Sequence, residues 1–156
     1  MLLSANQNVV VLTKTRSRWN GSSFRTWSDI EKDVKILAEK IKNTGFRFDK
    51  IATVSRGGLI PARLLADQLD IKDIFVDKKK IPAKTLFIDD IYDSGKTFRK
   101  ILSQVKFPDN FVYATLMARI KIKYPKQLIY AKKTKGMEYI IFPWELLEQK
   151  RSKTQK

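Results

Sequence analysis

The chain has 156 residues, enough for one domain of ordinary size, and 43% of them are hydrophobic, which suffices for a buried core. It contains neither Cys nor His, which excludes disulfides, thiol nucleophiles, Cys/His zinc sites and imidazole acid–base catalysis. Lys and Arg number 32 against 16 Asp and Glu, and the net charge of +16 predicts attraction to polyanions.

The N-terminal segment is basic, since residues 1–28 contain no acid. We interpret residues 1–25 as a basic arm or an added strand, with a possible strand at 9–12 and a turn at 20–23. The segment lacks a basic region followed by an apolar stretch, so no signal peptide is expected. No apolar run reaches the roughly 18–20 residues of a membrane span, and the expected compartment is the cytoplasm.

A helix is predicted from Ser28, where Ser28 and Glu31 have the spacing of a capping box. Apolar residues then recur at helical spacing at 30, 34, 37 and 41, and Gly45 ends the pattern.

An alternation of strands and helices follows. We expect strands at 51–54, 73–76, 85–88 and 111–116, helices at 59–69 and 95–105, and further strands at 128–130 and 139–142. Continuous apolar strands separated by helices predict an α/β fold with a central parallel sheet covered on both faces. The expected domain spans residues 26–148, and residues 149–156 are expected to form a basic, solvated tail.

The most informative motif follows the apolar segment at 85–88. It presents Asp89, Asp90 and Asp93 and then a Ser94-Gly95-Lys96-Thr97 turn that opens a helix. Backbone amides and hydroxyls in such a turn suit a phosphate dianion, and neighbouring carboxylates can bind sugar hydroxyls or a divalent cation. The motif therefore indicates a ribose-phosphate site.

Two other interpretations of the motif explain it less well. A Walker A loop requires Gly where Asp90 stands, so this one fails. Helix capping explains one or two of the acids but not three carboxylates together with Gly95.

The motif resembles the phosphoribosyl-pyrophosphate (PRPP) motif of the type I phosphoribosyltransferases. A second turn, residues 54–62 with Ser55-Arg56-Gly57-Gly58, is similar to the pyrophosphate loop of their xanthine–guanine branch. Thr26-Trp27-Ser28 and Phe142-Pro143-Trp144-Glu145 also resemble the opening and the ending of that branch. The similarity runs from about Thr26 to Glu145.

The resemblance implies a role for each matching residue. Pyrophosphate would be bound by the amides of Ser55, Arg56, Gly57 and Gly58, in a loop that often carries a cis non-proline peptide in the family. Asp89 and Asp90 would bind the ribose hydroxyls, directly or through Mg²⁺, and Ser94, Gly95, Lys96 and Thr97 would hold the 5′-phosphate. Asp93 would be the general base, and Arg119, Tyr139 and Ile140 would bind the purine.

The implied function is magnesium-dependent transfer of phosphoribosyl from PRPP to a 6-oxopurine (guanine, xanthine or hypoxanthine), giving a nucleotide and pyrophosphate. The resemblance also implies a homo-oligomer. Lys121 and Lys123 are rivals to Arg119 as the donor to the 6-oxo group, and Tyr139 is equally well explained as a core aromatic.

One region departs from the family. Only residues 77–84 join the strands expected at 73–76 and 85–88, where relatives have a longer hood and a mobile loop. A short connection predicts a wetter site. Lys78-Lys79-Lys80 could supply cationic cover for pyrophosphate or form a solvated charge run.

A second hypothesis keeps the fold but not the catalysis. The charge of +16, the basic stretch 119–135 and aromatic residues such as Trp19, Trp27 and Tyr124 fit a nucleotide-sensing regulator that binds nucleic acid. In that case, Lys132, Lys133 and Lys135 would carry the interaction.

Overall fold

A computed structural model describes residues 21–154, with side chains as far as residue 151. The possible strand at 9–12 and most of the predicted arm lie outside the described residues. The described chain forms two compact units, residues 28–137 and residues 21–27 with 138–154.

The first unit is built on a five-stranded sheet in the order β3-β2-β4-β5-β6. Every neighbouring pair of strands is parallel. This confirms the predicted fold class. The strands are β2 (Lys50–Thr53), β3 (Asp73–Val76), β4 (Thr85–Tyr92), β5 (Val112–Ala118) and β6 (Leu128–Lys133).

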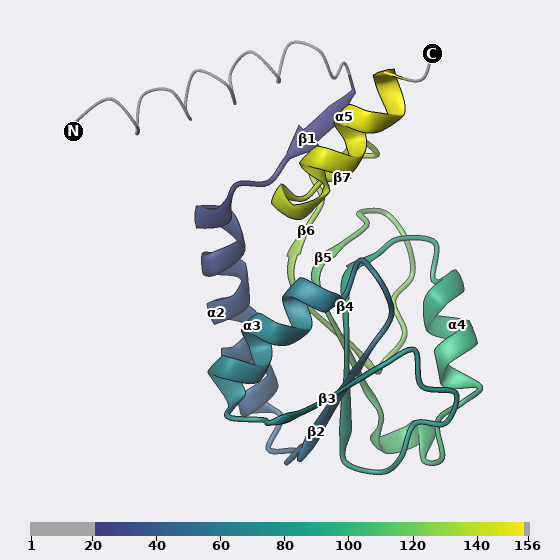
Figure 1. The fold of residues 1–156 in the computed structure, drawn as a ribbon. Helices are drawn as coiled ribbons and strands as arrows, with labels where there is room; N and C mark the ends of the chain where they lie inside the picture. The colour runs from purple at the N-terminus through teal and green to yellow at the C-terminus, as the bar shows by residue number, and fades with distance from the viewer. Residues whose placement is uncertain (1–20, 155–156) are drawn as a thin grey trace, which may run out of the picture. The chain divides into compact units, whose positions relative to one another are not determined.

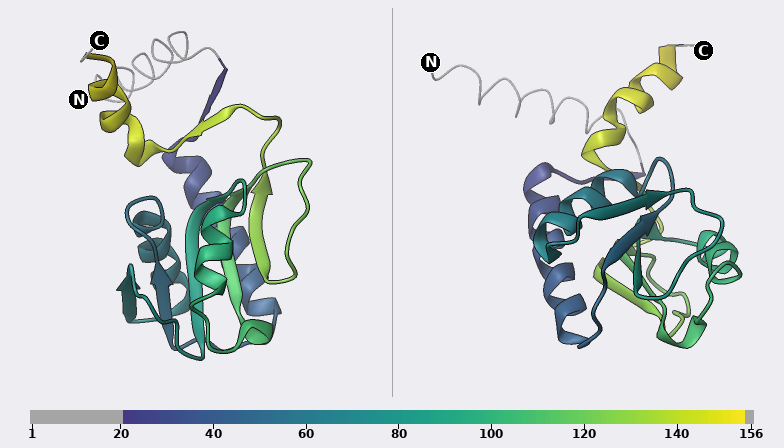
Figure 2. Two further views of the ribbon diagram at one scale, coloured as in Figure 1. Left: turned by 90° about the vertical axis from the view of Figure 1, so that its right-hand side faces the viewer. Right: turned by 60° about the horizontal axis from the view of Figure 1, so that its bottom comes forward.

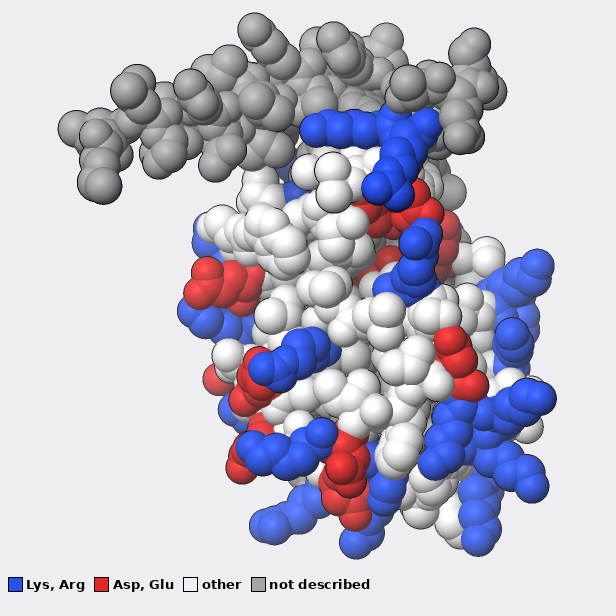
Figure 3. Space-filling view, in the orientation of Figure 1, with Lys and Arg blue, Asp and Glu red and all other residues white. Residues whose placement is uncertain are grey.

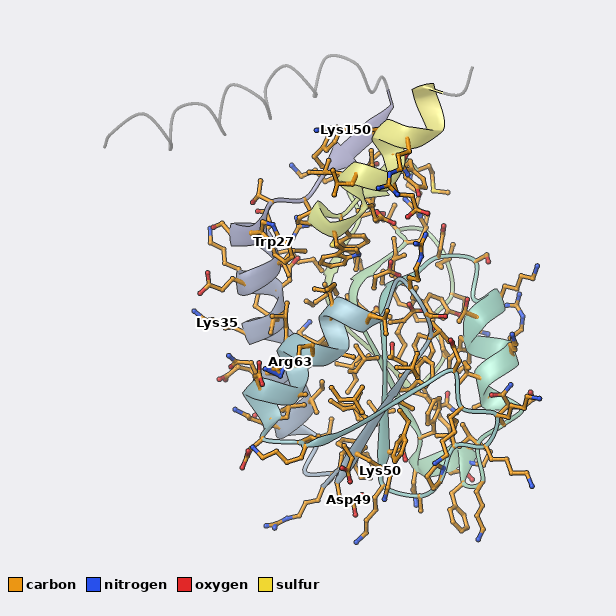
Figure 4. The ribbon with its side chains drawn as sticks, in the orientation of Figure 1. Trp27, Lys35, Asp49, Lys50, Arg63 and Lys150 are labelled. Carbon is orange, nitrogen blue, oxygen red and sulfur yellow. The ribbon has the colours of Figure 1, made fainter. Side chains whose placement is uncertain are left out.

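Helices cover both faces of this sheet. α2 (Trp27–Asn43) and α3 (Leu59–Leu69) lie on one face and α4 (Lys96–Leu102) on the other (Figures 1 and 2). The four apolar positions expected to face the core from the first helix are buried. Lys35 and Arg63 extend from the outer sides of α2 and α3 (Figure 4). Each helix therefore buries one apolar face against the sheet.

Two element boundaries differ from the prediction in ways that affect the site. β4 continues to Tyr92, so Asp89 and Asp90 are strand residues and not part of a turn. Pairing with β5, which includes Asp89 with Thr115 and Ile91 with Met117, keeps this segment extended. α4 covers only Lys96–Leu102, and the chain then turns through η1 (Pro108–Asn110) into β5.

The second unit contains a parallel pair of short strands, β1 (Ser22–Phe24) and β7 (Tyr139–Ile141). η2 (Pro143–Glu145) and α5 (Leu146–Thr154) follow, so part of the predicted solvated tail is helical. Trp144 stacks on Phe142 at 4.8 Å and lies 5.9 Å from Trp27. None of the helices in the described chain is long and apolar enough to span a membrane.

Candidate active site

The two predicted loops meet where the direction of the sheet's connections changes. β2 and β4 are neighbours, but the chain leaves β2 toward β3 on one side and leaves β4 toward β5 on the other. Such a switch opens a crevice at the carboxyl ends of the two strands. A pocket of about 260 Å³ lies there. Its lining comprises Val54, Ser55, Gly57, residues 89–98 and Tyr113.

Two glycines bring the first loop against β4. A Cβ on Gly58 would overlap the Thr53 hydroxyl and lie 2.8 Å from the Ile88 carbonyl oxygen. That hydroxyl donates a buried hydrogen bond of 2.7 Å to the same carbonyl. A Cβ on Gly57 would lie 2.6 Å from Asp90 Oδ2. Glycine is required at position 58 because the loop there touches the backbone of β4 directly, whereas the neighbour of Gly57 is the side chain of Asp90.

Asp77 holds the first loop, and the sequence analysis did not identify it. Its carboxylate accepts hydrogen bonds from the Ser55 amide at 2.9 Å and the Ser55 hydroxyl at 2.5 Å. Its own amide donates to the Thr53 carbonyl at 3.0 Å. The bonds from Ser55 lower the pKa of Asp77. The Ser55–Arg56 peptide is cis, as the family resemblance implied.

The two adjacent acids differ in environment. Asp89 is 6% exposed, and its carboxylate accepts hydrogen bonds from the Tyr113 hydroxyl at 2.7 Å and the Asp90 amide at 2.9 Å. Burial raises the pKa of Asp89 and also that of Tyr113, which therefore remains a donor. Asp90 is half-buried, and its Oδ1 accepts from the Ile91 amide at 2.7 Å.

This pair of carboxylates suits a hard divalent cation. The described residues contain no cluster of three Asp, Glu, His or Cys side chains that could hold a metal ion by itself. Mg²⁺ does not need one, because it commonly binds one or two carboxylates together with substrate phosphates and water. Asp89 and Asp90 supply oxygen ligands of the required kind.

The second loop is a tight turn at the start of α4. Gly95 adopts a φ of +79°, and a Cβ there would lie 2.5 Å from the Tyr92 hydroxyl. The Lys96 amide donates to Ser94 Oγ at 3.4 Å, and the Arg99 guanidinium donates to the Ser94 carbonyl at 3.3 Å. These contacts fix the turn beside Asp93 and the two strand acids.

Two residues predicted to have separate roles are bonded to each other. Arg119 Nε donates to Asp93 Oδ1 at 2.9 Å, and its NH1 donates to the Gly136 carbonyl at 3.4 Å. The Arg119 side chain is 7% exposed, whereas that of Asp93 is 60% exposed. The structure thus presents Asp93 to solvent with its orientation set by a buried guanidinium.

The remaining predicted residues lie elsewhere. Tyr139 and Ile140 are on β7 in the second unit, and their role toward a purine stays a prediction. Lys78, Lys79 and Lys80 do not line this pocket; the segment that carries them is pinned at Ile81, which is buried and bonded to Gln104.

Comparison with models of known protein families gives no match. Among curated proteins, the chain is similar to the xanthine-guanine phosphoribosyltransferase of Nitratidesulfovibrio vulgaris, with 27% identity over 77% of this chain and 82% of that protein. Proteins of the same name from Desulfotalea psychrophila and Roseobacter denitrificans match at 26% and 25% identity.

Solved structures agree. A purine phosphoribosyltransferase from Pyrococcus horikoshii matches with a TM-score of 0.65 and 26% identity, over 79% of this chain and 93% of that one. The Helicobacter pylori xanthine-guanine-hypoxanthine phosphoribosyltransferase has the same fold, with a TM-score of 0.69 at 22% identity over 85% of this chain and 99% of that one. The predicted resemblance to the type I phosphoribosyltransferases, and to their xanthine–guanine branch, is thereby confirmed.

Proposed function

We propose that the protein transfers the 5-phosphoribosyl group from PRPP to a 6-oxopurine (guanine, xanthine or hypoxanthine) and releases pyrophosphate. One observation carries the proposal: the loop at 55–58 and the acidic motif at 89–97 line a single pocket at the switch point of the sheet. The names of the relatives support purine phosphoribosyl transfer. Base preference and the use of Mg²⁺ are part of the proposal.

Different elements of the pocket bind different parts of PRPP. The amides of residues 55–58 bind the pyrophosphate, and Asp77 keeps that loop in place through Ser55. Asp89 and Asp90 bind the ribose hydroxyls, and the turn at 94–97 binds the 5′-phosphate. Mg²⁺ held by these two carboxylates would neutralise charge on the leaving pyrophosphate.

Asp93 is assigned as the general base. When the purine nitrogen attacks the anomeric carbon, the imidazole ring must lose a proton, and the exposed Asp93 carboxylate accepts it. Arg119 donates to both oxygens of this carboxylate, from Nε to Oδ1 at 2.9 Å and from NH2 to Oδ2 at 3.5 Å. Its role in this scheme is therefore to position Asp93.

The test is to incubate the protein with Mg²⁺, PRPP and each of guanine, xanthine, hypoxanthine and adenine, and to measure nucleotide and pyrophosphate. We expect base-dependent formation of both products. Asp93→Asn should lower turnover by about 100-fold or more while PRPP still raises the melting temperature. The matched control is Asp109→Asn, an exposed carboxylate on η1. Absence of nucleotide formation with all four purines would contradict the proposed function. Normal turnover by Asp93→Asn would contradict the assignment of Asp93 as the general base.

A further inference from the structure

A second concave surface lies at the other end of the sheet. One hollow, of about 630 Å³, is lined by residues 78–82 and 103–106. Another, of about 440 Å³, is lined by residues 45–48, 82–85, 105, 107, 110 and 111. The two hollows adjoin at Pro82 and Val105, which line both, and are together called here the basic groove. It lies at the amino ends of β2, β4 and β5, whereas the candidate active site lies at carboxyl ends.

The basic groove has a single sign of charge. Six cationic residues line it: Arg47, Lys78, Lys79, Lys80, Lys84 and Lys106. No carboxylate of the described chain does so, and none of the six forms an ion pair with another described residue. Figure 3 shows basic side chains gathered beside and below α4, at the lower right of that view.

The basic stretch at 119–135 differs from the groove in that three of its seven cations form ion pairs within the protein. Three of its cations form ion pairs: Arg119 with Asp93, Lys126 with Asp109 and Lys132 with Asp33. The Lys133 ammonium lies 5.5 Å and 5.9 Å from the ring centres of Tyr124 and Tyr130. The structure therefore favours the basic groove over this stretch as a surface for a polyanion.

Exposed aromatic rings line the same groove. Phe46 is 49% exposed and Phe107 is 50% exposed, although both are large apolar side chains. The Lys106 ammonium lies 5.3 Å from the centre of the Phe107 ring, so cation and ring are adjacent. Positive charge along a groove combined with accessible aromatic faces is the combination that binds single-stranded nucleic acid, since phosphates pair with the cations and bases stack on the rings.

The concave shape of the groove also favours a flexible strand over a membrane as its ligand. A concave groove admits a flexible strand, whereas a bilayer surface would contact protruding residues. The connection at 77–84 is held by its buried Ile81, whose amide donates to Gln104 at 2.9 Å and whose carbonyl accepts from Lys106 at 3.4 Å. The lysines are thus presented from a fixed segment. We propose that the basic groove binds single-stranded nucleic acid, with the lysines contacting phosphates and Phe107 stacking on a base.

The experiment measures fluorescence anisotropy of a fluorescein-labelled 12-nucleotide oligouridylate with the full-length protein at several KCl concentrations. The variant Lys78→Gln/Lys79→Gln/Lys80→Gln should weaken binding about tenfold or more and reduce the slope of log affinity against log salt by about 2, the value for three lost phosphate contacts. A control with the same loss of charge is Lys32→Gln/Lys35→Gln/Lys42→Gln, on the exposed face of α2.

Phe107→Ala should weaken binding about fivefold or more without changing the salt slope, because it removes a stacking surface and no charge. It also decides the question if the triple variant does not fold. No binding at 50 mM KCl (roughly the low end of the usual salt range), or equal weakening by the α2 control, would overturn the proposal. Groove-dependent binding to phosphatidylserine vesicles with none to the oligonucleotide would overturn it in favour of a membrane. The assay contains no PRPP, so its outcome is independent of the proposed transferase activity.

Discussion

Alanine substitutions at Gly58 and Gly57 should have different effects: Gly58→Ala should lower stability, and Gly57→Ala should impair PRPP binding. In Gly58→Ala the new methyl meets the Thr53 hydroxyl and the Ile88 carbonyl, and the carbonyl belongs to the backbone of the central strand. Overpacking of this kind costs about 1–3 kcal/mol. Displacement of the buried hydrogen bond from Thr53 to Ile88 adds about 1 kcal/mol. We therefore expect a loss of about 2–4 kcal/mol, which lowers the melting temperature of a chain this size by roughly 5–15 °C.

In Gly57→Ala the methyl meets only the side chain of Asp90, which can rotate away. Its melting temperature should stay within about 2 °C of the wild type, because few packing contacts change. PRPP should nevertheless no longer raise it, since the Asp90 carboxylate is displaced. Thermal unfolding of both variants, with and without Mg²⁺ and PRPP, measures both effects. If Gly58→Ala melts like the wild type, the close approach of this loop to β4 is refuted.

Three further predictions concern charged side chains. Lys132→Met should cost about 1–3 kcal/mol in urea unfolding, because it leaves the fully buried Asp33 without this partner while Lys132 itself is half exposed. Lys126→Met, which removes an exposed pair with Asp109, should destabilise the protein much less. Asp77→Asn should weaken pyrophosphate binding severalfold by calorimetry. The pKa of Asp77 lies below its ordinary 3.8. The ionised carboxylate should therefore contribute to the stability of the wild type above pH 3.8, and this contribution should be lost as the pH falls through the lowered pKa. Arg119→Lys should reduce kcat about ten- to hundredfold if Arg119 positions Asp93, whereas a raised KM for the purine alone would refute that role.

Local patterns in the sequence were sufficient for most of the fold. The helix at 59–69 and the strand at 73–76 have the predicted boundaries, because Pro61 sits in a first turn and a short apolar run is typical of a strand, although this one lies at the edge of the sheet and is partly exposed. The end of β4 was missed for a physical reason. Adjacent carboxylates normally favour turns, but here pairing with β5 and the hydrogen bond from Tyr113 hold Asp89 in a strand.

The sequence was sufficient to recognise the two loops of the candidate site, but not the residues that hold them in place. Asp77 is 22 residues from Ser55, and Arg119 is 26 residues from Asp93. Neither pair has a spacing that a helix or strand would explain, so only the order of the strands brings them together. For the same reason the sequence indicated the positive charge of the protein without showing that Arg119, Lys126 and Lys132 form ion pairs with other parts of the chain.

The anchoring of Ile81 has a kinetic consequence. A connection tied at its midpoint to the end of α4 cannot swing over the pocket as a lid. In a catalytic cycle at this pocket, departure of the nucleotide would not wait for this connection to open. Lengthening the connection with flexible residues should therefore leave the rate of product release unchanged.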